Sequence, residues 1–295
     1  MRYVLRRLVY SLFQLAIVSS ATFFMFRVAP ADFYSLELDN PQRRAASTAT
    51  ERKAHGLDRP WEAQYMDWVQ SSLRGDFGQS LAYELPVRRL LAPRILKTLT
   101  VAVPALLLAW ILGIGAAIFG VRTRVAATLD PSAAAAAMIP DVIAVSLLLW
   151  LAVAVGLRID TPWLPIASLT GAIAPVIFLH ASGELRHALD LEFVRIAQAR
   201  GIRGWQLWLK YVLPAAANPL ISLAGLSAAS AVGSSFLVEA LTGWPGVGPL
   251  FLEAVQSRDY PIVQTMLTGL SAVLILGNFV ADIAIYRLDP RIRVI

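Results

Sequence analysis

The chain has 295 residues, of which 57% are hydrophobic and only 16% are charged, and its mean hydropathy is +0.60. A soluble domain carries about 25% charged residues, so the composition excludes an ordinary globular domain and predicts a protein embedded in a bilayer. The net charge is +6, but no basic face with interleaved aromatic residues accompanies it, and we expect no nucleic-acid partner. The absence of cysteine excludes disulfides, thiolate nucleophiles and cysteine-ligated metals.

Six apolar stretches are long enough to cross a bilayer, which takes about 20 helical residues. They cover residues 8–29, 99–121, 132–157, 163–182, 211–238 and 260–281. The sequence therefore predicts an all-α, polytopic membrane protein with six transmembrane helices. The fourth stretch is the weakest of the six, because it is short and contains two prolines and a histidine.

Basic residues predict the orientation, because cytoplasmic loops carry an excess of Lys and Arg. Arg2, Arg6 and Arg7 precede the first span, and the 183–210 segment contains five more basic residues, whereas the short loops on the other side contain one each. We expect both termini in the cytoplasm. The predicted organisation is a basic segment with the first span (1–29), an extracytoplasmic loop (30–98), and a five-span core (99–295) that contains a cytoplasmic loop at 183–214.

The 30–98 segment is the only sizeable stretch outside the predicted membrane. Trp61, Tyr65 and Trp68 recur at helical spacing, which predicts an amphipathic helix with an aromatic stripe. The residues from Gly75 to Gly78 form a predicted turn after it.

Ionisable residues within membrane spans are costly and usually functional. Arg27 lies near the outer end of the first span, where its side chain can reach the interface. Asp282 lies near the inner end of the last span, where we expect it to pair with a nearby base such as Arg287. Asp141 follows Pro140 well inside the third span, and we regard it as a candidate for the translocation pathway.

A histidine-rich trio is the strongest metal candidate. His180, Glu184 and His187 fall on one helical face, and imidazole with carboxylate can bind a transition metal. The trio lies at the cytoplasmic end of the fourth span, however, where solvation or pairing with Arg186 explains it more simply. We therefore expect no metal and no cofactor.

The fifth span is built from small residues at four-residue spacing. Gly225, Ala229 and Gly233 form one row, and such faces allow helices to pack closely in lipid. Polar residues of the last two spans are either pathway-lining groups or ordinary hydrogen-bonding residues between helices. These candidates are Ser230, Ser234, Thr268 and Asn278.

The charged segment 183–213 is exceptional in so apolar a chain. Glu192 to Arg200 fits an amphipathic helix with Phe193, Ile196 and Ala197 on one face. Gly201 is suited to end this helix in the left-handed conformation. A second amphipathic run follows, formed by Trp205, Trp208, Leu209 and Val212. The two runs predict a rigid knob at the cytoplasmic face, although an interfacial membrane helix has a similar pattern.

Motifs in three ordered regions carry a resemblance to a known family. Residues 192–201 read EFVRIAQARG, and Leu213-Pro214 follows downstream. The predicted external loops contain RGDFGQS (74–80), EALTGWPGVGP (239–249) and SRDYP (257–261). The C-terminal tail contains LDPR (288–291). Together they resemble the dipeptide/oligopeptide/nickel branch of ABC importer permease subunits, and specifically the first of the two permeases. The chain departs from many relatives after the first span, where it reads Pro30-Ala31-Asp32-Phe33.

The resemblance implies a function and a set of partners. The knob would be the coupling loop that fits a groove of a cytoplasmic ATPase, with Glu192, Phe193, Arg195, Ala197, Ala199, Arg200 and Gly201 as its functional residues. The expected partners are a second, homologous permease, ABC ATPase subunits, an extracytoplasmic solute-binding protein and the lipid bilayer. The expected location is a prokaryotic inner membrane, and the expected cargo is a peptide or a related small solute.

Two alternatives belong to other classes. A stand-alone transporter driven by an ion gradient would use Asp141 and Asp282 as relay sites, but it leaves the 192–201 knob without a role. A membrane-embedded enzyme is disfavoured, because neither a G-x-S-x-G turn nor an H-E-x-x-H zinc motif occurs. The chain also lacks a G-x-x-x-x-G-K-[ST] phosphate loop, so we expect ATP hydrolysis to be performed by partner subunits.

Overall fold

The computed structural model describes residues 2–28, 59–158 and 161–288. Within these ranges all regular elements are helices, with one isolated antiparallel bridge between Gln79 and Pro86. In chain order the helices are α1 (Arg2–Val28), α4 (Trp61–Leu73), α5 (Val87–Thr123), α6 (Ala126–Ala137), α7 (Asp141–Ala154), α8 (Trp163–Asp190), α9 (Glu192–Ala199), α10 (Gly204–Leu207), a π-helical turn (Trp208–Val212), α11 (Leu213–Thr242), α12 (Val247–Gln256) and α13 (Tyr260–Leu288).

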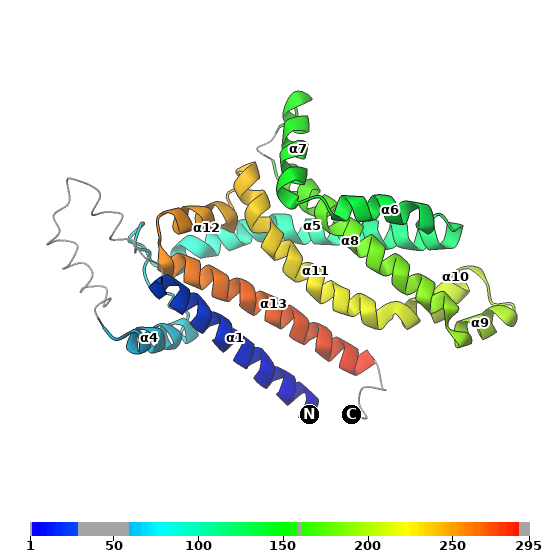
Figure 1. Ribbon diagram of the computed structural model, residues 1–295, viewed down its shortest axis with the longest axis horizontal. Coiled ribbons are helices and arrows are strands. Elements are labelled where there is room, and N and C mark those ends of the chain that lie inside the picture. Colours follow the sequence, from blue (N-terminus) through cyan, green and yellow to red (C-terminus); the bar gives the residue numbers. More distant parts are fainter. Residues whose placement is uncertain (1, 29–58, 159–160, 289–295) are drawn as a thin grey trace.

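Among the described residues, five helical segments are long and apolar enough to cross a membrane, and the bent pair α6–α7 makes a sixth when it is counted as one span. The predicted all-α polytopic fold is therefore confirmed. Figure 1 shows α9 and α10 at one end of the molecule, and α4 and α12 toward the opposite end. The beginning of α1 and the end of α13 lie close together in this view. The separation of the charged loop from α4 and α12 agrees with the orientation that the basic residues predict.

The third predicted span is interrupted, which the single apolar stretch 132–157 did not anticipate. The axes of α6 and α7 meet at 93°. Pro140 explains the break, because a proline has no N–H to donate and its ring clashes with the carbonyl four residues earlier. The fourth stretch, the weakest by sequence, is instead a continuous 28-residue helix, α8.

Small residues bring the long helices close together, as the sequence predicts. A Cβ added to Gly225 would lie 3.2 Å from Cβ of Ala281 on α13 and 3.3 Å from the carbonyl oxygen of Gly277. A Cβ on Gly113 of α5 would lie 2.7 Å from the side chain of Ile177 on α8. Gly233, by contrast, has open space around it. Close packing therefore explains Gly225 but not the whole row.

The first helix is fixed to the last helix and to α4. The Arg7 guanidinium lies 2.9 Å from the Asp282 carboxylate, so this acid pairs with a base of α1 that the sequence did not point to. Tyr65 hydrogen-bonds Ser19 and Ser20 at 2.8 Å, which seats the predicted aromatic stripe of α4 on α1. The side chains of Arg27 and Arg287, the Pro30–Phe33 turn and the tail motif lie outside the described residues.

Candidate functional site

The 183–213 knob has the helix–glycine–helix form that its sequence predicts. α9 runs from Glu192 to Ala199, and Gly201 follows with a φ of +85°. No atom lies within 4 Å of a Cβ built on Gly201, so the backbone conformation, and not crowding, requires glycine there. Arg195 pairs with Asp190 at 2.9 Å and ties α9 to the end of α8.

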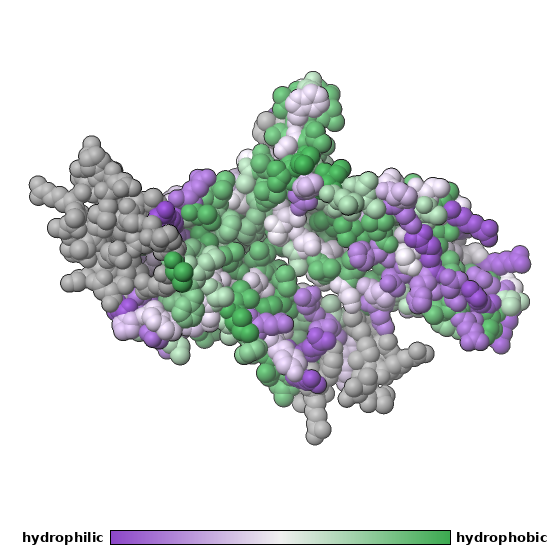
Figure 2. Space-filling view, viewed as in Figure 1, coloured by the Kyte–Doolittle hydropathy of each residue, from purple (hydrophilic) through white to green (hydrophobic). Residues whose placement is uncertain are grey.

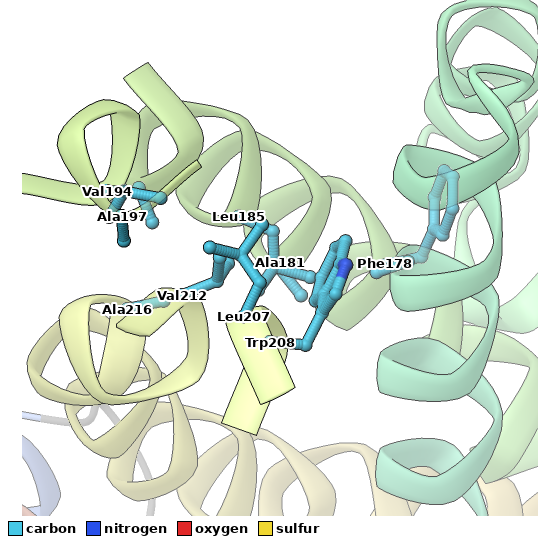
Figure 3. Close-up of a cluster of buried hydrophobic side chains, with 11 residues drawn as sticks. Phe178, Ala181, Leu185, Val194, Ala197, Leu207, Trp208, Val212 and Ala216 are labelled. Carbon is cyan, nitrogen blue, oxygen red and sulfur yellow. The ribbon is translucent and has the colours of Figure 1, made fainter. Parts of the chain in front are cut away.

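One buried cluster anchors the knob to the membrane helices (Figure 3). Its members come from α5, α8, α9, α10, the π-helical turn and α11. They are Ala117, Phe178, Ala181, Leu185, Ala188, Val194, Ala197, Leu207, Trp208, Val212 and Ala216. The cluster therefore packs α9 directly against residues of three long helices, α5, α8 and α11.

The outward face of α9 is apolar as well as charged. Phe193 is 50% exposed and Ile196 is 46% exposed, and the charged residues Glu192, Arg195 and Arg200 of the same segment are exposed as well. Figure 2 shows hydrophilic residues gathered at the end of the molecule where Figure 1 places α9 and α10. Two exposed apolar side chains within a charged rim have the composition of a protein-docking surface.

The predicted face of α9 is wrong at one position. Ala197 does not share the face of Phe193 and Ile196 but is buried with Val194 against the chain's own cluster. The helix is only eight residues long and has apolar residues on both sides, so periodicity alone did not separate its inward and outward faces. Ala199 is exposed, as a small residue available for close approach.

The second amphipathic run, Trp205 to Val212, also has one buried face and one exposed face. Trp208 and Val212 are buried in the cluster, whereas Trp205 and Leu209 are more than half exposed. The Arg122 guanidinium, at the cytoplasmic end of α5, lies 4.8 Å from the centre of the Trp205 ring. This cation–π contact is a second link between α5 and the knob.

A second organised region, which contains the 239–249 motif but whose buried contacts the sequence did not predict, closes the opposite end. Glu239 is fully buried near the end of α11 and accepts a hydrogen bond of 2.8 Å from the Gly248 N–H. Val247 donates its N–H to the Thr98 hydroxyl at 3.0 Å, so α5, α11 and α12 meet at this point. The available signal was a carboxylate at the end of an Ala/Gly/Ser-rich span, followed by closely spaced glycines.

The 79–86 turn is fastened to the same end by Asp259. This fully buried carboxylate accepts hydrogen bonds from the Ser80 hydroxyl at 2.5 Å and from the Ala82 N–H at 3.0 Å. Tyr83 donates its hydroxyl proton to Glu253 on α12, and this bond raises the pKa of the Tyr83 phenol above its usual range. Part of the 30–98 segment is therefore fixed onto the final external loop.

Asp259→Ala is expected to loosen this turn. The buried Ser80 hydroxyl would lose its acceptor, which costs about 1–3 kcal/mol for a buried group left unpaired, and the exposed Ala82 N–H would lose its acceptor at a smaller cost. The measurement is the unfolding temperature of the detergent-solubilised chain together with protease cleavage within 79–86. Asp76→Ala is the matched control, because it removes an exposed carboxylate that accepts one hydrogen bond from Gly78. Equal effects of the two changes would contradict a fastening role for Asp259.

The pathway candidates occupy several elements. Ser230 and Ser234 lie in the middle of α11, with Ser230 exposed and Ser234 half-buried. Thr268, in the outer half of α13, has a buried hydroxyl without a hydrogen-bond partner among the described residues. Asn278, in the inner half, lines a cavity of about 250 Å³ together with Arg7 and Asp282. Asp141 is on a different element, the first turn of α7.

The histidine trio is not assembled as a ligand set. His180 contacts the carbonyl oxygen of Val176 through Nδ1 at 2.9 Å. Arg186, which the sequence suggested as a partner, pairs with Asp130 of α6 at 2.7 Å. In the part of the chain that the structure describes, no three His, Asp or Glu side chains are grouped as a metal site would require.

These observations define a class of protein, namely a polytopic helical membrane protein with an exposed amphipathic helix anchored to its spans. Comparison with known protein families identifies the family to which the chain belongs. Residues 99–294 match the family described as binding-protein-dependent transport system inner membrane component, and residues 1–101 match the N-terminal region of such membrane components. The chain belongs to this family of ABC importer permease subunits, which are multi-pass proteins of the bacterial inner membrane.

Individual relatives agree with that assignment. The chain is 30% identical to a probable peptide ABC transporter permease of Sinorhizobium fredii, with 99% of each chain covered. It is also 30% identical, with the same coverage, to the glutathione transport system permease GsiC of Salmonella choleraesuis. An inward-facing structure of the MetNI methionine ABC transporter superposes with a TM-score of 0.57 at 19% identity. The match covers 68% of this chain and 96% of that one, and it shows the shared fold.

Proposed function

We propose that α9 and the adjoining loop are the surface through which a cytoplasmic ABC ATPase drives this permease. The observation that carries the proposal is that one face of α9 is exposed and the other is buried against the chain's own membrane helices. Phe193 and Ile196 are available to a partner, while Val194 and Ala197 are locked into the cluster that joins α5, α8 and α11. A gradient-driven transporter has no use for such a surface, and family membership supports an ABC permease over that alternative.

The mechanism that follows is alternating access. Closure of two ATPase subunits on ATP would draw two coupling helices together, and the buried cluster would pass this motion to the long helices. Hydrolysis, carried out by the partner subunits, would reset the passage. The chain would form half of the translocation pathway, as the first permease of a heterodimer, and a solute-binding protein would deliver cargo to the outer end, where the 79–86 turn and α12 meet.

The proposed cargo is a peptide or a related small solute. The support is the named function of two relatives that match the full chain, a probable peptide permease and a glutathione permease. We include Asp141, Ser230, Ser234, Thr268 and Asn278 as proposed pathway residues. Uptake of labelled dipeptides and glutathione by cells that produce the assembled complex separates these solutes.

Co-purification with candidate ATPase subunits tests the proposed coupling. The tagged wild-type chain is expected to retain the ATPase in mild detergent, and Gly201→Val is expected to lose it or to uncouple its hydrolysis from transport. A β-branched residue at a φ of +85° costs about 1–2 kcal/mol. Gly183→Val is the control, because Gly183 lies in α8 with open space around it. A wild-type chain that retains no ATPase would overturn the proposal.

A further inference from the structure

The break between α6 and α7 is the most unusual feature of the predicted membrane region. α6 ends at Ala137, α7 begins at Asp141, and the two helices meet at 93°. Figure 1 shows much of α7 projecting from the layer of long helices, although its base packs against α8 and α11, and Figure 2 shows that this projection is largely hydrophobic. Only Val145 and Ala152 of α7 are buried.

The break lies deep in the membrane. α6 begins beside the cytoplasmic end of α5, where a Cβ added to Gly120 would lie 3.2 Å from Ala126. A helix of 12 residues rises by about 18 Å, and the hydrocarbon core is about 30 Å thick. The chain therefore turns near the middle of the bilayer.

The break leaves polar groups without hydrogen bonds or ion pairs in the described structure, which hydrocarbon does not accommodate. Met138 is 83% exposed and Ile139 is 45% exposed, and in the described structure no backbone hydrogen bond reaches the carbonyl of either residue. The Asp141 carboxylate, three residues from Met138, has no ion pair among the described residues. Irregular backbone is tolerated at membrane depth only where protein buries it or where it lines water. An intramembrane carboxylate must likewise be buried by protein or face water.

Resting on the proposed permease function, we infer that this break lines a water-filled passage between the chain and its second permease. Within that passage, Asp141 favours solutes that carry a positive charge. The carbonyls of Met138 and Ile139 and the carboxylate are all hydrogen-bond acceptors, so the ligand class that suits them is an ammonium group or water. The apolar side chains of α7 can face lipid or the second permease, but this acceptor group cannot face lipid.

Single cysteines test the inference directly, because the chain has none of its own. Met138→Cys is compared with Ile111→Cys, whose side chain is 67% exposed on α5. α5 ends at Thr123 and α6 begins at Ala126 on the same, cytoplasmic side of the membrane. Residue 111 lies 12 residues before Thr123, and residue 138 lies 12 residues after Ala126, so the two positions lie at similar depths in the bilayer. The tagged chain is labelled in membrane vesicles that contain both permeases, with membrane-impermeant methanethiosulfonates of either charge, and is then purified.

The expected result has two parts. Because only a thiolate in water reacts readily, the Met138→Cys thiol is expected to react with the cationic reagent at least about tenfold faster than the Ile111→Cys thiol. Adding Asp141→Asn is then expected to lower the ratio of cationic to anionic reaction rates by about fivefold, as local electrostatic focusing implies.

Equal rates at the two positions, or an unreactive Met138→Cys thiol, would overturn the water-lined passage. An unchanged rate ratio after Asp141→Asn would overturn the role of Asp141. Ile139→Cys provides a second exposed position if the first variant is poorly produced. The labelling needs neither ATP nor the ATPase, so its failure is distinguishable from failure of the coupling experiment.

Discussion

Gly248→Ala is expected to cause one of the largest losses of stability of any single methyl addition to this chain. The added Cβ would lie 2.1 Å from the carbonyl oxygen of Phe236 and 3.0 Å from Cβ of Glu239. The nearest atom belongs to the backbone of α11, so a side-chain rotation cannot relieve the clash and α12 must move. That movement also lengthens the hydrogen bond from the Gly248 N–H to the buried Glu239 carboxylate.

Both effects destabilise the folded state. Overpacking costs about 1–3 kcal/mol, occasionally more, and a typical intramolecular hydrogen bond contributes about 0.5–1.5 kcal/mol. We expect a total of about 3 kcal/mol or more, measured as a lower unfolding temperature and a lower yield of monodisperse chain in detergent.

Gly233→Ala is the matched control for this experiment. Gly233 lies in the same long helix that Gly248 approaches, α11, but no atom lies within 4 Å of a Cβ built on it. Alanine is preferred to glycine in a helix by about 1 kcal/mol, so this variant should be as stable as the wild type or slightly more stable. If Gly248→Ala unfolded at the same temperature as Gly233→Ala, the close contact between α11 and α12 would be contradicted.

Local patterns predicted the elements of this structure well. The length and polarity of the apolar stretches located the membrane helices, because a span must be continuous and nearly uncharged. The Glu192–Arg200 helix and its glycine end were also predictable, since amphipathic spacing and a left-handed residue leave clear local signals. The predicted boundary of α9 differs from the observed one by a single residue.

Contacts between distant segments were not predictable in the same way. Asp282 pairs with Arg7, which is 275 residues earlier, and Asp259 binds a turn 179 residues earlier. No local pattern encodes such partners. The interruption at Pro140 was visible in the sequence, but a hydropathy average over 132–157 hides one proline among many apolar residues. Which face of α9 is buried depends on the positions of α8 and α11 around it. Those positions are a property of the tertiary structure and not of the local sequence.

The second large effect is expected at the outward face of α9. Phe193→Asp or Ile196→Asp should weaken ATPase binding more than about tenfold, because exposed apolar residues at the centre of an interface dominate its affinity. Both side chains are about half exposed in the chain itself, so each variant should fold normally. Val194→Asp should instead unfold the knob, because Val194 is fully buried and an unpaired buried charge costs several kcal/mol.

Two measurements on each variant separate docking from folding: the ratio of ATPase to permease after affinity purification, and the unfolding temperature in detergent. Leu73→Asp is the control, since Leu73 is 84% exposed at the end of α4 and the substitution introduces the same charge at the opposite end of the molecule. It should change neither quantity. ATPase retained by Phe193→Asp and Ile196→Asp at the wild-type ratio would show that this face of α9 is not the docking surface. A wild-type unfolding temperature for Val194→Asp would show that the buried cluster does not hold the knob, and that α9 cannot pass force to the membrane helices through it.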